Sequence, residues 1–246
     1  MFKQSLFAGV VCLLSAGAAH AATVSEVPQV GVVQQSQALG AAFGRDIKPA
    51  RFDAGSQVNE AFDLIREGKQ AQAVKLFDRV IAFAEPAEGD SRPRLCRNDK
   101  AAEVKGRGQA VLLDGAVCDA HFGKGFALID LGRGDLAEAE LLKATQLAPA
   151  NAHYANEYAE LFKARRQWQE SYDLFARAWA IVDKEKTGPD AAVAARALRG
   201  MGYNKIELGA FDEAERLFRQ SQEYDPGSEA AKAEIGYIAR KKAIGS

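Results

Sequence analysis

The fold of this protein is decided by a stretch near the C-terminus, GAFDEAERLFRQSQEYDP, which spans residues 209–226. The stretch opens with Gly209, and a small residue, Ala214, follows five positions later. Phe218 lies four positions beyond that alanine, and Ser221 lies three beyond the phenylalanine. Small and large apolar residues at spacings of three and four describe one face of an amphipathic helix. The glycine before them is typical of a turn, and the closing proline is typical of a helix end.

The same pattern occurs three more times, so the chain contains repeats. The small residue of the four copies is Ala73, Ala137, Ser171 and Ala214. The large residue four positions later is Phe77, Leu141, Phe175 and Phe218. The second and third copies are 34 residues apart, whereas the other two steps are longer. One step of 34 between two longer steps is the spacing that insertions in an array of 34-residue units produce.

These residues resemble the tetratricopeptide repeat, a helix–turn–helix unit with small and large apolar residues at fixed positions. In that family the first helix carries a small residue twelve positions before the small residue of the second helix. Those positions hold Ala61, Gly125, Ala159 and Gly202 in this chain. The family's tryptophan, four residues earlier, is replaced by Gln57, His121, Ala155 and Leu198. The resemblance covers about residues 57–223 and implies an all-α solenoid of four tetratricopeptide repeats.

The sequence between and around the repeats indicates where each unit begins and ends. We expect repeats at residues 57–84, 118–149, 151–183 and 191–226. An insertion at residues 85–117 is rich in helix breakers, and a loop at residues 184–190 contains Gly188 and Pro189. Ser228 is a good N-cap for a capping helix at residues 228–243. Residues 22–56 have weak periodicity and are expected to form an extended or disordered leader.

The N-terminus predicts export from the cytoplasm. Lys3 precedes an apolar stretch from Leu6 to Leu14, and Ala19-His20-Ala21 matches a signal-peptidase site. The apolar stretch has about half the length of a membrane span. We therefore expect a signal peptide at residues 1–21, cleavage after Ala21, and a periplasmic or secreted protein without an integral membrane segment. Cys12 raises the alternative of a lipid anchor, but the residues before it fit a lipobox poorly.

Two cysteines remain after this cleavage, and they allow two interpretations. In an exported protein, Cys96 and Cys118 predict one disulfide that pins the insertion. Closing a loop of about 23 residues would stabilise the fold by about 3 kcal/mol. The alternative is a metal- or small-ligand-binding module in which Cys96, Cys118 and His121 supply ligands, with Asp119 as a fourth ligand for zinc. We favour the disulfide because a second closely spaced ligand pair is missing.

Composition and motifs argue against several other function classes. The formal net charge of −1 provides no electrostatic footprint for nucleic acid. The sequence has no P-loop and no G-x-S-x-G motif around a serine or lysine. His121 and His153 are the only histidines left after cleavage, which argues against a catalytic triad. We therefore expect neither enzyme activity nor a cofactor.

The resemblance also implies a binding groove lined by the first helix of each repeat. The groove positions of the family are occupied here by Asn59, Phe62, Arg66, Phe122, Phe126, Asp130, Asn156, Glu157, Lys163, Arg199 and Tyr203. Arg196 lies one helical turn before Arg199 and is expected to line the same groove. By the same resemblance, Asn59 and Asn156 would hold a peptide backbone through their amides. Val58 and Phe62 stand where the carboxylate clamp of chaperone-binding members has lysine and asparagine, so the resemblance does not extend to that clamp.

Function follows from this groove as an expectation. An aromatic half and a charged half suit an extended or helical segment with an apolar anchor and a polar flank. An alternative is that the insertion packs on Phe122 and Phe126 and fills the groove itself. We expect a non-catalytic periplasmic scaffold that binds a protein or peptide, in cell-envelope assembly or in secretion. Repeat scaffolds share a fold and differ in their partners, so the pattern does not name the partner.

Overall fold

The computed structural model describes residues 52–84, 91–105, 109–182 and 184–245. The expected signal peptide, nearly all of the expected leader and part of the expected insertion lie outside the described residues. The account below concerns the unit that begins at Phe52.

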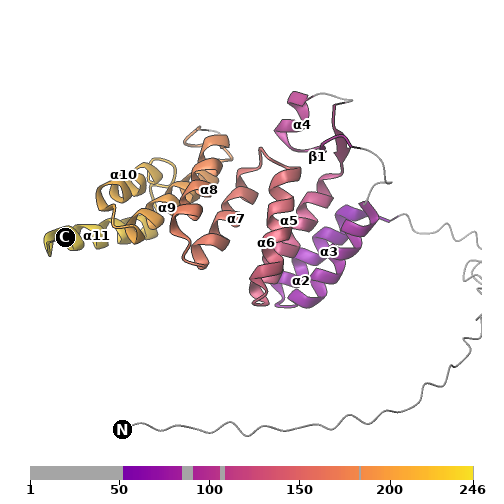
Figure 1. The fold of residues 1–246 in the computed structure, drawn as a ribbon, viewed down its shortest axis with the longest axis horizontal. Helices are drawn as coiled ribbons and strands as arrows, with labels where there is room; N and C mark the ends of the chain where they lie inside the picture. The colour runs from indigo at the N-terminus through magenta and orange to yellow at the C-terminus, as the bar shows by residue number, and fades with distance from the viewer. Residues whose placement is uncertain (1–51, 85–90, 106–108, 183, 246) are drawn as a thin grey trace, which may run out of the picture. The chain divides into compact units, whose positions relative to one another are not determined.

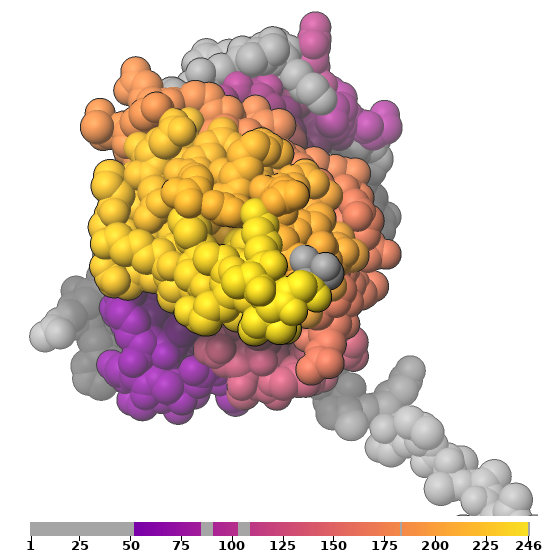
Figure 2. All heavy atoms as spheres, turned by 90° about the vertical axis from the view of Figure 1, so that its left-hand side faces the viewer, coloured from indigo at the N-terminus to yellow at the C-terminus, as the bar shows by residue number. Residues whose placement is uncertain are grey.

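Consecutive helices of this unit pack in pairs (Figure 1). The pairs are α2 (Ala54–Arg66) with α3 (Gln70–Ala84), α5 (Gly115–Asp130) with α6 (Gly134–Leu147), α7 (Ala152–Ala164) with α8 (Trp168–Ile181), and α9 (Ala191–Glu207) with α10 (Phe211–Ser221). The second helix of each pair contacts the first helix of the next pair. A final helix, α11 (Glu229–Ala243), packs on α9 and α10 and covers the C-terminal end of the array (Figure 2). The expected helix–turn–helix solenoid is confirmed.

Two helices begin earlier than expected because capping residues precede them. The Asp53 carboxylate accepts a hydrogen bond of 3.2 Å from the Ser56 amide, so α2 begins at Ala54, inside the expected leader. The Asp114 carboxylate accepts a hydrogen bond of 2.9 Å from the Ala116 amide, so α5 begins at Gly115, inside the expected insertion. Side-chain acceptors at these positions satisfy amides that have no partner within the helix.

The residues that carry the repeat pattern form the core between the two helices of each pair. Ala214 is completely buried and Phe218 is 2 % exposed, and the corresponding residues of the other pairs are completely buried. A Cβ atom added at Gly202 would lie 2.8 Å from the Phe218 ring. One added at Gly125 would lie 2.7 Å from Leu141 Cγ. The small residue of the first helix therefore makes room for the large residue of the second.

A second glycine makes room for the large residue of the preceding pair. A Cβ atom added at Gly200 would lie 2.5 Å from the Phe175 ring, and one at Gly123 would lie 2.3 Å from the Phe77 ring. Each ring thus presses directly on the backbone of the next pair's first helix. In α7 the same position holds Glu157. The signal in the sequence is a Gly-x-Gly motif, of which the repeat pattern uses only the second glycine.

The turn within each pair requires a left-handed backbone. Gly68, Gly132 and Gly209 have φ of 75°, 71° and 77°, and Arg166 takes the same place in the third pair with φ of 59°. Glycine adopts this conformation without a steric penalty, which explains why the pattern opens with it.

We expect the substitution Arg166→Gly to stabilise the protein by about 0.5–1 kcal/mol. A residue with a side chain is strained in the left-handed region, and this strain exceeds the entropy that glycine adds to the unfolded chain. The Arg166 side chain is exposed, so little packing is lost. Urea unfolding measures the change, and the matched control Arg177→Gly, within α8, should destabilise by about 1 kcal/mol. A lower unfolding midpoint for Arg166→Gly would contradict the argument.

The insertion forms a small parallel sheet. Strand β1 (Arg94–Cys96) pairs with β2 (Val111–Leu113), with Leu95 opposite Leu112, and a short helix, α4 (Lys100–Lys105), lies between them in sequence. Leu95, Ala102 and Ala110 are buried together under this sheet. Strands of three residues are too short to show an alternating pattern, so the sequence indicated only an apolar run here.

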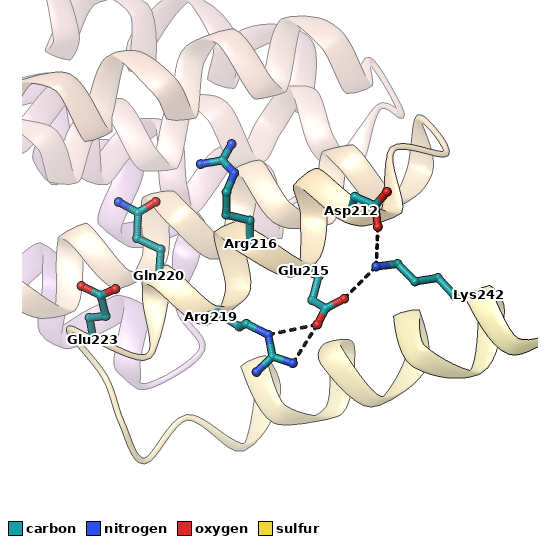
Figure 3. Close-up of a pocket in the computed structure, with 7 residues that line it drawn as sticks. All are labelled: Asp212, Glu215, Arg216, Arg219, Gln220, Glu223 and Lys242. Atoms are coloured by element: carbon teal, nitrogen blue, oxygen red, sulfur yellow. Dashed lines mark hydrogen bonds and ion pairs between the residues drawn. The ribbon is translucent and has the colours of Figure 1, made fainter.

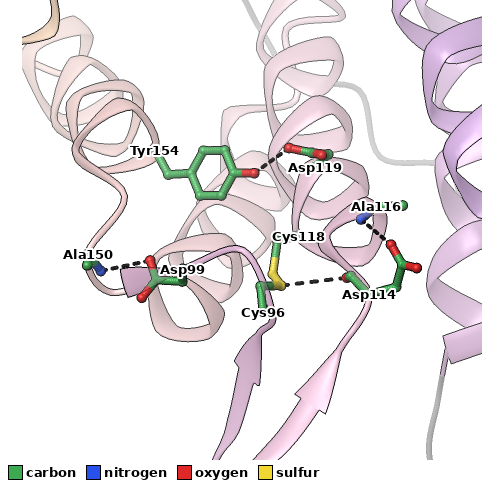
Figure 4. Close-up of a disulfide and its surroundings, with 8 residues drawn as sticks. All are labelled: Cys96, Asp99, Asp114, Ala116, Cys118, Asp119, Ala150 and Tyr154. Atoms are coloured by element: carbon green, nitrogen blue, oxygen red, sulfur yellow. Dashed lines mark hydrogen bonds between the residues drawn. A yellow bond between two sulfur atoms is a disulfide. The ribbon is translucent and has the colours of Figure 1, made fainter. Parts of the chain in front are cut away.

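A disulfide joins this sheet to the array, as predicted. Cys96 at the end of β1 is bonded to Cys118 in α5, with the two Cα atoms 6.4 Å apart (Figure 4). Both cysteines are completely buried. Beyond the disulfide, the Asp99 carboxylate accepts hydrogen bonds of 2.8 Å from the Ala101 amide and 3.0 Å from the Ala150 amide. The insertion is therefore fixed to the second pair covalently and to the α6–α7 turn by a hydrogen bond.

Candidate peptide-binding groove

A shallow pocket of about 190 Å³ lies between the first helices α7 and α9 and the capping helix α11. Its lining residues are Glu160, Lys163, Arg196, Arg199, Gly200, Tyr203, Phe218, Ala230 and Glu234. Four residues expected in the groove, Lys163, Arg196, Arg199 and Tyr203, therefore share one pocket. Gly200 and Phe218 belong to the repeat core, so the pattern that builds the fold also forms part of this pocket's lining.

Ion pairs hold the cationic side chains of this pocket in place. The Arg196 guanidinium pairs with the Glu157 carboxylate, and it lies 3.8 Å from the Glu160 carboxylate. The Lys163 ammonium pairs with the same Glu160. Burial acts against the charge of Arg196, yet the hydrogen bond and charge of Glu157 raise the pKa of Arg196 above its ordinary value. Arg196 and Glu157 therefore form a fixed charged pair that links α9 to α7.

Tyr203 is the aromatic centre of the pocket. Its ring centroid lies 5.3 Å from the Lys163 ammonium and 6.1 Å from the Trp168 ring, which meets it edge to face. Burial, followed by the negative charges of Glu207 and Glu234, raises the pKa of the Tyr203 phenol. A half-buried ring of this kind offers an apolar face and a hydroxyl to a ligand.

Three residues expected to face a ligand are instead buried. Asn156 is completely buried and donates a hydrogen bond of 3.0 Å to the Val193 carbonyl, which ties α7 to α9. Its expected role in holding a peptide backbone is therefore wrong for this structure. Glu157 is 9 % exposed and is occupied by Arg196. Phe122 is 8 % exposed and stacks on Tyr154, with ring centroids 5.0 Å apart.

Residues of the insertion share an apolar cluster with Phe122. Cys96 lies in the same apolar cluster as Phe122, and Leu113 packs against that cluster. Phe126 is only half buried.

The remaining expected groove residues lie on α2 and α5, and none of them lines the pocket. Asn59 is exposed, and Phe62 is half buried against the rings of Phe77 and Phe122. Arg66 is exposed and pairs with Asp63 in its own helix. Asp130 is exposed and accepts a hydrogen bond of 3.3 Å from the Gln70 amide. These residues lie outside the pocket between α7, α9 and α11.

The alternative metal site finds no support in the geometry. The sulfur atoms of Cys96 and Cys118 are bonded to each other, and His121 Nδ1 lies 2.7 Å from Glu140 Oε2 on α6. Glu140 also lies 2.6 Å from the Lys124 ammonium, so His121 belongs to a network between α5 and α6. In the described ranges, no group of three or more histidine, cysteine or acidic side chains could hold a metal ion.

A larger hollow of about 630 Å³ lies between α10 and α11 (Figure 3). Its lining is charged or polar, and most of it is engaged within the protein. Lys242 lies 2.8 Å from the Glu215 carboxylate and also pairs with Asp212, while Arg219 lies 2.7 Å from Glu215. The two pairs of Lys242 fasten the end of the capping helix to α10. We interpret this hollow as part of the helix–helix contact.

No helix in the described part of the chain has the length and apolar character needed to cross a membrane.

Paired helices with a pocket on their first helices define a helical-repeat protein with an accessible groove. A tetratricopeptide-repeat family model matches residues 149–226, and a second such model matches residues 119–151. Residues 119–226 are therefore tetratricopeptide repeats. The pocket lies within the first of these matches. A search of curated proteins found no match.

Solved structures support the same fold at low sequence identity. PilF of Pseudomonas aeruginosa is 14 % identical, with a TM-score of 0.58 over 78 % of this chain and 69 % of that chain. A putative kinesin light chain of Podospora anserina with tetratricopeptide-like repeats is 16 % identical, with a TM-score of 0.56 over 78 % and 87 %. MamA of Desulfovibrio magneticus RS-1 is 15 % identical, with a TM-score of 0.54 over 77 % and 85 %. These similarities concern the fold alone.

Proposed function

We propose that this protein is a non-catalytic scaffold that binds a segment of a partner protein between α7, α9 and α11. The observation that carries the proposal is the convergence of Lys163, Arg196, Arg199 and Tyr203 on one pocket. Ion pairs fix the cations in advance, so binding loses little side-chain entropy there. The pocket contains a half-buried tyrosine beside arginines, and tyrosine and arginine are enriched among the residues that contribute most of the binding energy of protein interfaces.

We further propose that this binding takes place in the periplasm or outside the cell, in envelope assembly or in secretion. The proposal is supported by residues 1–21, in which a charged residue is followed by an apolar stretch and then by small residues. This order resembles a signal peptide. The buried disulfide agrees with an oxidising compartment. Expression of the full chain in a Gram-negative host followed by cell fractionation tests this part. A mature protein whose first residue is Ala22 is the expected result, and an uncleaved cytoplasmic protein would contradict it.

Groove binding can be tested with peptides selected on the protein itself. A display library of random peptides is selected on residues 22–246, and the affinities of the selected peptides are measured by fluorescence anisotropy. We expect Tyr203→Ala and Arg199→Ala each to weaken binding by about tenfold or more, as loss of a contact worth over 1 kcal/mol does. Arg199 also holds Asp225 at 2.9 Å, so thermal unfolding must first show that this variant is folded.

The matched control is Arg216→Ala, because Arg216 is an exposed arginine on α10, away from the pocket. It should leave the affinities unchanged. Peptides that bind the Tyr203→Ala variant as tightly as the original protein would overturn the proposed groove.

A further inference from the structure

The basic side chains of the groove have ion-pair partners within the protein, whereas some of the acidic side chains do not. This difference indicates which charge a ligand should carry. The three cations of the groove already have partners on the protein. Arg196 pairs with Glu157, Lys163 with Glu160, and the Arg199 guanidinium lies 2.9 Å from the Asp225 carboxylate. A ligand carboxylate would have to displace one of these internal partners, which reduces the net gain from binding an acidic group.

Two carboxylates at or beside the pocket, Glu234 and Glu207, have no cationic partner among the described residues. Glu234 of α11 lines the pocket, and Glu207 lies one helical turn beyond Tyr203 on α9. In the described ranges, neither makes an ion pair with a lysine or arginine, whereas Glu160, in the same pocket, holds two cations. Burial, together with the charge of Glu207, raises the pKa of Glu234. The two acids therefore repel each other across the edge of the pocket.

The surroundings of these acids suit a cation. The charges of both acids act on the Tyr203 phenol, whose hydroxyl also hydrogen-bonds the Glu207 carboxylate. An aromatic face attracts a cation, and here Lys163 already approaches this ring. Arg166 is the remaining cation that acts on Tyr203, and it is exposed on the α7–α8 turn. A cationic side chain of a ligand would reduce the repulsion between the Glu207 and Glu234 carboxylates.

We propose that the bound segment is basic and places a lysine or arginine side chain between Glu207 and Glu234, against Tyr203. This inference rests on the proposed function and specifies its ligand. The partner is thus a protein with an exposed basic segment. Opposite charges across an interface set the choice of partner more than the overall affinity.

The test uses two pools of display peptides of equal length and equal apolar content, one with lysine and arginine and one with aspartate and glutamate at the variable positions. We expect residues 22–246 to bind the basic pool at least tenfold more tightly, with affinity falling as salt rises. Glu234→Gln should weaken the basic peptides at least fivefold and should raise the melting temperature of the free protein, since it removes the repulsion. The paired reversal Glu207→Lys with Glu234→Lys should shift the preference to the acidic pool.

The outcomes separate this inference from the proposed function. Peptides that depend on Tyr203 but show no charge preference, or prefer acidic residues, would overturn the basic ligand and leave the groove standing. Peptides that do not depend on Tyr203 would overturn both. The control Glu170→Gln, an exposed acid on α8, should change neither the affinity nor the preference.

Discussion

Replacement of Phe175 by alanine is expected to lower the free energy of unfolding by about 3–5 kcal/mol. The Phe175 ring is completely buried, and it packs with Leu198, Met201 and Leu217 of the next pair. One side chain therefore joins the third pair to the fourth. A loss of this size is a large share of the stability of an ordinary domain. Urea unfolding monitored by far-UV circular dichroism measures it, and Phe83→Ala, at a position that is 65 % exposed, should cost much less.

Gly200 supplies a sharper test of the same contact. On its own, Gly200→Ala should destabilise by about 1–3 kcal/mol, because its Cβ would lie 2.5 Å from the Phe175 ring. In a Phe175→Ala background the clash is absent, and alanine should then stabilise the helix by up to about 1 kcal/mol. The sign of the effect of Gly200→Ala should therefore reverse. An equal cost in both backgrounds would show that the ring does not press on this glycine.

Removal of the disulfide has the second largest expected effect. The double variant Cys96→Ala with Cys118→Ala should lose about 3 kcal/mol, since the bond closes a loop with a sequence separation of 22 residues. Among the described residues, the core of the small sheet that it pins consists of Leu95, Ala102 and Ala110. Chemical reduction of the original protein in urea should lower its stability to that of the variant.

Hydrogen exchange shows where this loss acts. Protection should fall in residues 94–113 and at the start of α5, while α9, α10 and α11 should keep their protection, because the repeats contact mainly their neighbours. Equal stability of the variant and the original protein would mean that the remaining contacts of the insertion fix it without the bond.

The repeat architecture could be predicted from the sequence because it depends on spacing. Ala73, Ala137, Ser171 and Ala214 are all completely buried, as a contact surface between two helices requires. The exact helix starts could not be predicted in the same way, because Asp53 and Asp114 set them through single capping bonds outside the pattern. The sheet of the insertion was also missed, since β1 and β2 pair only through the tertiary fold.

The groove was predicted less completely than the fold. Lys163, Arg196, Arg199 and Tyr203, all expected in the groove, line one pocket, since their positions depend on the register of two helices. Asn156 was also expected to face a ligand, but its amide donates to the Val193 carbonyl and joins α7 to α9. The family positions did not reveal this, because residues on that face of α7 can either contact the next helix or face a ligand. Glu234 was missed, since it comes from the capping helix, to which the repeat pattern does not extend.

The central claim is that α7, α9 and α11 together bind a polypeptide segment, and peptide-induced protection in hydrogen exchange tests it most directly. A selected peptide at saturating concentration is added to residues 22–246, and exchange is followed by mass spectrometry of short fragments. The account predicts added protection in the fragments that contain Lys163, Tyr203 and Glu234, with none on α8. Protection that instead gathers on α8 and α10, with these three fragments unchanged, would contradict it.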